Sequence, residues 1–233
     1  MRPAELEELA RGGAVSELAR AGVPIPPAEG RDRLDREELE RSRAELRAKI
    51  LAAPEKAGFP VWAHARAGAP EMRHALLGAF VARWCDGGAV LTGPTGIGKS
   101  TALTALAHRL AADAAALVGS SAWKELRAWR MLRRARYLTA AELVRAVKAH
   151  RLGAGTADAL EHALGATWLV VDDLGHEASG SEPLITEIVD RRYRDRRPTH
   201  AATGLTLAEL AARYGDATVR KLWEPRGMIV EAW

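Results

Sequence analysis

The stretch from Ala89 to Leu103 contains residues whose types and spacing could hold a chain of phosphates. Gly93, four intervening residues, and then Gly98 and the pair Lys99-Ser100 match the phosphate-loop pattern at every fixed position. Glycines let the backbone curl until its N–H groups face phosphate oxygens, and the helix that follows directs its positive end to the same place. The predicted nucleotide-binding residues are Gly93, Pro94, Thr95, Gly96, Ile97, Gly98, Lys99, Ser100 and Thr101.

Two carboxylates complete a set of residues suited to phosphate chemistry. Residues 167–175 read as a buried strand that closes on Asp172 and Asp173. In a parallel sheet the carboxyl end of such a strand faces the phosphate site. Lys99 would reach the β- and γ-phosphates, while Ser100 and Asp172 would hold Mg²⁺, the latter through the metal's water shell. Asp173 would orient or activate the attacking water. The alternative is an ordinary Asp turn, and the phosphate loop upstream favours the functional interpretation.

The elements that must position these residues alternate along the chain. Because strands and helices alternate, we expect a parallel sheet with right-handed crossovers. Thr139 and Glu142 form a capping box at the start of one helix. The predicted fold is α/β, a parallel five-stranded sheet flanked by helices. Its strands are expected at residues 89–91, 135–138, 167–173, 200–203 and 228–230, and its helices at 75–84, 101–115, 140–151, 156–164, 183–193, 207–214 and 218–223.

A helical N-terminal region is expected before this α/β domain. The predicted boundary falls at residue 60, so the two parts are residues 1–60 and 61–233. Residues 34–52 form the strongest helix pattern there, with a thin apolar stripe and charged remaining faces. Such a helix is either solvated with one edge on a neighbour, or a docking helix for a partner. A partner-binding role for residues 1–60 is therefore one of two interpretations.

Composition excludes several classes of protein. The chain has 233 residues and a single cysteine, Cys85, so an intramolecular disulfide and a multi-cysteine zinc site are excluded. No apolar run reaches membrane-spanning length, and the N-terminus has no apolar signal core. We therefore expect a cytoplasmic protein without a membrane partner. The formal charge of +4 and the pI near 9.5 permit nucleic-acid binding without establishing it.

Basic residues gather in two places. Within the interval 119–136, Trp123, Arg127, Arg130 and Arg134 would share one stripe if this part of the chain is helical. This stripe would either track a nucleic-acid backbone or be the solvated face of an amphipathic helix. The second place, the arginine run 191–197, is interpreted as a solvated surface. The predicted DNA-binding residues are Trp123, Lys124, Arg127, Arg130, Arg133 and Arg134.

Together these motifs resemble the DnaC/IstB-like AAA+ ATPases, which are bacterial helicase loaders and transposition ATPases. The resemblance covers about residues 88–223, and its phrases are GPTGIGKST, RYLTAAELVRAV, LVVDDLG, TEIVDRRYRDRRPT and GLTLAELAARYG. It implies an AAA+ core of the P-loop NTPase fold without a C-terminal lid domain, and ATP with Mg²⁺ bound between subunits. It also implies a homo-oligomeric ring or filament on single- or double-stranded DNA. The implied partner is a replicative helicase or a transposase.

The sequence departs from the family pattern at two catalytic positions. Gly204 replaces the polar sensor that the family usually carries, and Thr203 is the nearest polar candidate for that role. Lys221 stands where the resemblance places an arginine finger, with Arg220 beside it, and a lysine lacks the planar fork of arginine. Hydrolysis is therefore expected to be slow or partner-dependent. Two other functions stay open: a nucleotide-dependent switch with little hydrolysis, and a P-loop small-molecule kinase.

Overall fold

The computed structural model describes residues 28–60, 70, 72–84, 87–120, 127–150, 157–224 and 226–233, without side chains for 28–35 and 127. Cys85 lies outside these residues. The chain forms two compact units, Met1–Arg47 and Ala48–Trp233. The boundary between them falls inside helix α2 (Ala28–Leu51), whose side chains from residue 36 to 47 are exposed or half-buried. None of the helices in the described residues is both long enough and apolar enough to cross a bilayer.

The predicted five-stranded parallel sheet is confirmed. Its strands lie in the order β2-β3-β4-β1-β5, and every neighbouring pair is parallel. All residues of the three central strands are buried, which explains their continuous runs of apolar and small residues. The strands are β1 (Ala89–Thr92), β2 (Ala135–Thr139), β3 (Trp168–Asp172), β4 (Thr199–Thr203) and β5 (Met228–Glu231).

Strand register brings the chemically important strand ends to one edge. Thr92, the last residue of β1, pairs with Thr203 at the end of β4. On the other side of β4, Val171 of β3 pairs with Ala201, so that Asp172 also reaches this edge. The phosphate loop follows Thr92 directly. Parallel pairing therefore sets the loop and the carboxylates at the same end of the sheet.

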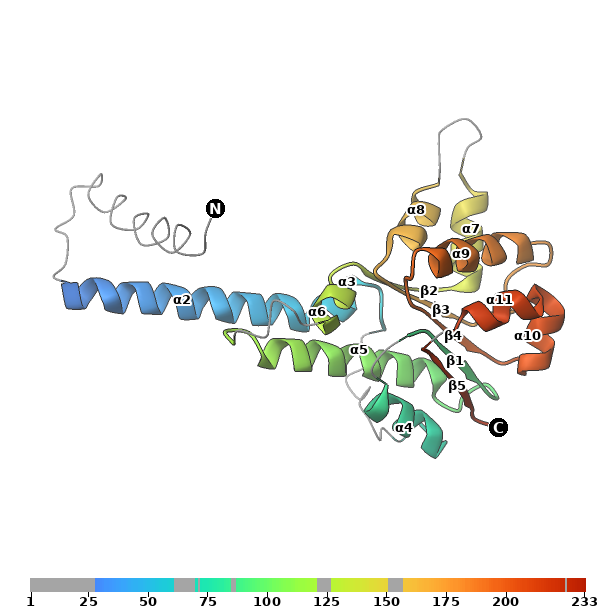
Figure 1. Ribbon diagram of the computed structural model, residues 1–233, viewed down its shortest axis with the longest axis horizontal. Coiled ribbons are helices and arrows are strands. Elements are labelled where there is room, and N and C mark those ends of the chain that lie inside the picture. Colours follow the sequence, from blue (N-terminus) through green and yellow to red (C-terminus); the bar gives the residue numbers. More distant parts are fainter. Residues whose placement is uncertain are drawn as a thin grey trace. The chain divides into compact units, whose positions relative to one another are not determined.

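Helices cover both faces of the sheet (Figure 1). Helices α4 (Ala75–Arg83) and α5 (Lys99–Ala116) lie on one face. The core of the other face joins Leu169 and Val171 to apolar residues of the helices packed above them. Those helices are α7 (Ala140–Lys148), α8 (Asp158–Gly165), α9 (Glu182–Arg194), α10 (Leu207–Tyr214) and α11 (Asp216–Lys221). Two short helices, α3 (Ala53–Lys56) and α6 (Arg127–Leu132), complete the described elements.

Local sequence signals explain several helix starts. Thr139 caps α7, and the capping box with Glu142 is confirmed. Thr206 caps α10 in the same way with Glu209. The expectation of a helical stripe that reaches Arg134 is wrong at its end, because α6 stops at Leu132, whereas the strand expected at 135–138 is confirmed as β2. The chain there must leave the helix to pair β2 with β3, beginning at Ala135.

A buried aromatic cluster attaches the segment after α3 to the sheet. The ring of Phe59 packs 5.2 Å from that of Trp168, which lies 5.2 Å from the imidazole of His200. The indole of Trp168 donates a hydrogen bond to Nδ1 of His200 over 2.9 Å. Burial, with a further contribution from Arg192, lowers the pKa of His200 to about 3. The imidazole is therefore neutral at physiological pH and accepts this hydrogen bond inside the core.

Arg192 corrects the interpretation of its arginine run as a solvated surface, because its side chain is fully buried. Its guanidinium donates to the carbonyl oxygens of Ala163 and Ala166 at the end of α8, at 2.7 and 2.8 Å. It also donates to the carbonyl of Pro198, just before β4, and to the hydroxyl of Thr199, the first residue of β4. Burial, and then the positive charge of Arg197, lower its pKa to about 9, which leaves Arg192 cationic at neutral pH. One buried cation therefore ties α8, α9 and β4 together.

Arg192→Met should destabilise the protein strongly, because it leaves several buried carbonyl groups without a donor. We expect the free energy of unfolding to fall by about 3 kcal/mol or more. Arg191→Met is the matched control on the same helix, where the arginine is half-exposed and pairs with Glu187. That control should change stability by no more than about 0.5 kcal/mol. Urea unfolding of both variants measures the difference, and equal losses would contradict the structural role of Arg192.

Candidate nucleotide site

The phosphate loop has the backbone conformation that its glycines predict. Gly93, Gly96 and Gly98 have φ angles of 150°, 81° and 100°, which residues with a side chain rarely adopt. A Cβ on Gly93 would stand 2.5 Å from the carbonyl oxygen of Ala232, so glycine is also needed there for close packing against the residue after β5. Gly98 precedes the first residue of α5, whose N-terminal N–H groups open toward the loop. The loop is thus an anion-binding turn at a helix N-terminus.

Lys99 lies within this turn and is 8% exposed. Its Nζ donates hydrogen bonds to the carbonyl oxygens of Gly93 and Pro94, at 2.7 and 2.9 Å. Burial lowers the pKa of Lys99, and the negative charges of Asp172 and Asp173 oppose this change. The ammonium group is therefore held over the loop, near both carboxylates, where it can meet a phosphate chain.

The acidic pair follows β3 with two different environments. Asp172 is 4% exposed, and its Oδ1 accepts a hydrogen bond from the backbone N–H of Asp173 over 2.9 Å. Asp173 is exposed and adopts a left-handed backbone conformation with φ of 52°. Asp tolerates this conformation better than most residues because its short side chain hydrogen-bonds locally. The chain therefore turns sharply after β3 and separates a buried carboxylate from a solvent-facing one.

Tyr137 is a member of the site that the sequence analysis missed. Its hydroxyl donates a short hydrogen bond to Oδ2 of Asp172 and also lies within hydrogen-bonding reach of Ser100. Burial, reinforced by the charge of Asp172, raises the pKa of Tyr137, so the phenol stays protonated and donates. The only sequence signal is a polar-tipped aromatic near the end of the strand beside β3. Tyr137 thus stands between the two predicted Mg²⁺ ligands, Ser100 and Asp172.

The residues present fit a nucleotide with Mg²⁺. Space beside Gly96 is open, because a Cβ built there meets no atom within 4 Å. The hydroxyl of Ser100 and the carboxylate of Asp172 are hard oxygen donors of the kind that Mg²⁺ prefers. Among the described residues there is no cluster of three or more His, Cys, Asp or Glu that could enclose a metal. A metal here would need oxygens from the nucleotide itself, as is usual for Mg²⁺.

The loop after Asp173 is anchored by Glu177. Its Oε2 accepts from the backbone N–H of Gly175, and its Oε1 accepts from the Arg213 guanidinium and the Tyr214 hydroxyl of α10. Burial alone would raise the pKa of Glu177, but the hydrogen bonds from Tyr214 and Arg213 outweigh it and lower that pKa. A buried, ionised carboxylate therefore fixes the loop that leaves Asp173.

Thr203 and Gly204 lie beside this loop. The Thr203 hydroxyl is buried, donates to the carbonyl of Leu174 over 2.6 Å and accepts from the N–H of Leu205 over 3.0 Å. A Cβ on Gly204 would stand 3.3 Å from Nε2 of His176, so the imidazole occupies the space beside this glycine. Thr203 is therefore occupied in holding the loop, while His176 is a second polar group that the sequence analysis missed.

The two residues at the predicted arginine-finger position, Lys221 and Arg220, have different surroundings. Nζ of Lys221 lies 2.8 Å from Oδ1 of Asp190 in an ion pair that is about two-thirds buried on the lysine side. Nε of Arg220 lies 3.8 Å from Glu224, and 62% of the Arg220 side chain is exposed. The ion pair of Arg220 is thus longer than that of Lys221, and the side chain of Arg220 is more exposed.

The structure describes only part of the predicted DNA-binding set. Trp123, Lys124 and the side chain of Arg127 lie outside the described residues. Arg130 is exposed on α6, whereas Arg133 and Arg134 lie in the turn before β2 and not on the helix. The continuous stripe expected from Trp123 to Arg134 is therefore wrong at Arg134.

Tyr137→Phe should change two properties in opposite directions: it should destabilise the protein without ligand and should increase the affinity of the site for Mg²⁺. Loss of a hydrogen bond to a buried carboxylate should lower the free energy of unfolding by about 2 kcal/mol in the absence of ligand. The change also frees Oδ2 of Asp172, so the Mg²⁺ concentration needed for half-maximal nucleotide binding should fall about threefold. Titration of a fluorescent ATP analogue at several Mg²⁺ concentrations measures this. A higher Mg²⁺ requirement in the variant would instead make Tyr137 a support for the metal-bound carboxylate.

Comparison with solved structures returns matches of low sequence identity. The crystal structure of the DnaC helicase loader is 23% identical with a TM-score of 0.47, and the match covers 66% of this chain and 85% of that one. The crystal structure of DnaI is 20% identical with a TM-score of 0.46, and covers 68% and 78%. No protein-family model and no curated protein matches the chain.

Proposed function

We propose that this protein is an AAA+ ATPase that binds ATP with Mg²⁺, oligomerises on DNA, and loads or regulates a replicative helicase or a transposase. One observation carries the proposal: Lys99 lies in a glycine turn at a helix N-terminus, and the charges of Asp172 and Asp173 act on its ammonium group. A nest of backbone N–H groups, a lysine and an acidic pair at one strand edge suit a nucleoside triphosphate.

Each residue of the site has a separate role in this proposal. The loop from Gly93 to Thr101 binds the phosphates, with Lys99 as its cation, and Ser100 and Asp172 supply oxygens to the metal. Bound Mg²⁺ would neutralise part of the phosphate charge. Asp173, which faces solvent, positions a water for attack on the γ-phosphorus and takes up its proton, so that ADP and phosphate result. Tyr137 holds Asp172 in place when the metal is absent.

The site is completed by a neighbouring subunit. Arg220 is better suited than Lys221 to reach a neighbour's nucleotide, because its guanidinium is more exposed and its partner is more distant. An arginine also offers a planar fork to phosphate oxygens. His176 supplies a polar group beside Gly204, where a sensor side chain is missing. Thr203 holds the loop after Asp173 through its hydrogen bond to the carbonyl of Leu174. Residues 61–233 would form the ATPase domain and residues 1–60 a partner-binding region.

A second function is favoured by the ion pair of Lys221 with Asp190 and by Gly204. Both weaken the parts of a AAA+ site that sense and stimulate hydrolysis. The protein would then be a switch that changes its assembly on ATP binding and turns ATP over very slowly. Phosphate release measured with and without DNA separates the two functions.

Asp173→Asn should lose ATP hydrolysis, whereas Lys99→Ala should lose ATP binding. Asn also tolerates the left-handed backbone at position 173, so the fold should be kept while hydrolysis falls about a hundredfold or more. ATP binding by Asp173→Asn should be unchanged. Lys99→Ala should lose ATP binding and, with it, the ATP-dependent oligomers detected by sedimentation. Equal oligomerisation of Lys99→Ala with and without ATP would contradict the proposal.

A mixing experiment tests whether the site is shared. Arg220→Ala should lower hydrolysis about tenfold or more without changing ATP affinity, because only the trans-acting cation is lost. Lys221→Ala, the neighbouring control, should have a smaller effect. Arg220→Ala keeps its own carboxylates, and Asp173→Asn keeps its arginine, so mixed oligomers contain some complete sites. Recovery of activity on mixing is the expected result, and no recovery would place Arg220 outside the site.

A further inference from the structure

Trp233 is an exposed aromatic residue beside the phosphate loop. Its side chain is 55% exposed, which is unusual for tryptophan, a residue that is highly buried on average. The residue before it, Ala232, is buried and donates its backbone N–H to the carbonyl of Thr92 over 2.9 Å. Thr92 ends β1 and directly precedes the loop. The segment after β5 therefore lies against the start of the phosphate loop (Figure 1).

The indole of Trp233 is anchored to this part of the loop. Its Nε1 donates a hydrogen bond to Oγ1 of Thr92 over 3.2 Å, and Thr92 is fully buried. The backbone before it also packs closely, since a Cβ on Gly93 would stand 2.5 Å from the carbonyl oxygen of Ala232. These contacts hold the ring at the loop while more than half of the side chain faces solvent. An anchored, exposed aromatic ring is available to a flat ligand.

The strand order shows which end of a nucleotide would meet this ring. The phosphate loop follows β1; β4 and β3 lie on one side of β1, and β5 lies on the other. The charges of Asp172 and Asp173, after β3, act on the ammonium group of Lys99. The metal and the terminal phosphate therefore belong on the β3 side of the loop. The nucleoside end of the same chain then leaves the loop on the β5 side, where Trp233 lies.

We propose that Trp233 stacks on the base of the bound nucleotide. The assignment rests on the proposed function for the kind of ligand and adds a residue that contacts its base. Every base has an aromatic face, and a base stacked on an aromatic side chain contributes binding energy that phosphates alone cannot supply. The loop and Lys99 hold the phosphates, and Trp233 makes the protein prefer a nucleotide to a bare chain of phosphates.

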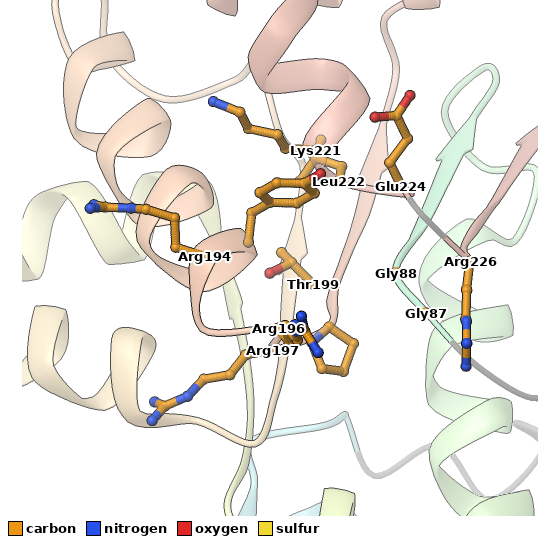
Figure 2. Close-up of a pocket in the computed structure, with 12 residues that line it drawn as sticks. Gly87, Gly88, Arg194, Arg196, Arg197, Thr199, Lys221, Leu222, Glu224 and Arg226 are labelled. Carbon is orange, nitrogen blue, oxygen red and sulfur yellow. The ribbon is translucent and has the colours of Figure 1, made fainter.

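Tyr193 offers a matched control at the other edge of the sheet. This tyrosine of α9 is 38% exposed and lines a pocket of about 600 Å³ together with Gly87, Gly88 and Thr199 (Figure 2). Gly88 directly precedes β1, and Thr199 is the first residue of β4. The pocket therefore lies at the amino ends of the strands, whereas the phosphate loop follows the carboxyl end of β1. Loss of the Tyr193 ring should leave nucleotide binding unchanged.

Calorimetric titration of the full chain with ADP and with pyrophosphate, both in the presence of Mg²⁺, tests the proposal. Pyrophosphate carries the phosphates of ADP without its base. Trp233→Ala should bind ADP about tenfold more weakly than wild type, as expected for one lost stacking contact, and should bind pyrophosphate as wild type does. Trp233→Phe keeps an aromatic ring and should recover most of the affinity for ADP. Tyr193→Ala should bind both ligands as wild type does.

Two further measurements separate stacking from a structural effect. ADP should quench part of the tryptophan emission of wild type, whereas pyrophosphate should not, and Trp233→Phe should abolish this difference. Because Trp233 is mostly exposed, Trp233→Ala should change the melting temperature by less than about 3 °C.

Two outcomes would overturn the proposal alone. Equal weakening of ADP and pyrophosphate by Trp233→Ala would mean that Trp233 only supports the loop through Thr92. Unchanged affinity of that variant for ADP would mean that the ring does not contact the base. The proposed function would fail differently: wild type would then bind ADP and pyrophosphate no better than Lys99→Ala does, and the assignment of Trp233 would fall with it.

Discussion

The parallel hydrogen-bond register of β1, β4 and β3 is the constraint on which the site depends. Thr92 is level with Thr203, and Val171 is level with Ala201, so the chain leaves β1 and β3 at the same edge. The glycine turn and the acidic pair then meet although they are far apart in sequence. A slip of one residue in β3 would reverse every side chain of that strand, moving Asp172 away from Ser100 and Tyr137.

The two ends of the sheet carry opposite chemistry. The carboxyl ends of the strands gather Asp172, Asp173 and hydroxyl groups, around one buried lysine. The amino ends gather arginines around Thr199. Arg192 belongs to neither surface. Its guanidinium donates hydrogen bonds to carbonyl groups of α8 and of the turn before β4, and to the hydroxyl of Thr199. This buried cation holds the Thr199 hydroxyl and the turn between α9 and β4 in place.

Hydrogen bonding also explains how an exposed catalytic candidate can have a defined position. Asp173 is in a left-handed turn on the surface, yet the backbone on both sides of it is held. On one side its N–H donates to Asp172, and on the other Glu177 attaches the loop to Arg213 and Tyr214 of α10. A movement of α10 would therefore change the position of Asp173. In the proposed function, such a connection would give a neighbouring subunit or a partner a physical route to the nucleotide site.

The sequence by itself determined the features that depend on short, regular spacing. The phosphate loop is recognisable because its glycines and Lys99 act through their own backbone turn, and the alternation of strands and helices indicated a parallel sheet with both faces covered. The capping box at Thr139 is local for the same reason. Tertiary structure alone decided which side chains surround each group. Tyr137 reaches Asp172 across 35 residues of sequence. In the arginine run, Arg192 is buried and Arg196 lines a pocket, although their local sequences look alike. Burial and partners depend on which elements meet, and local sequence does not specify that.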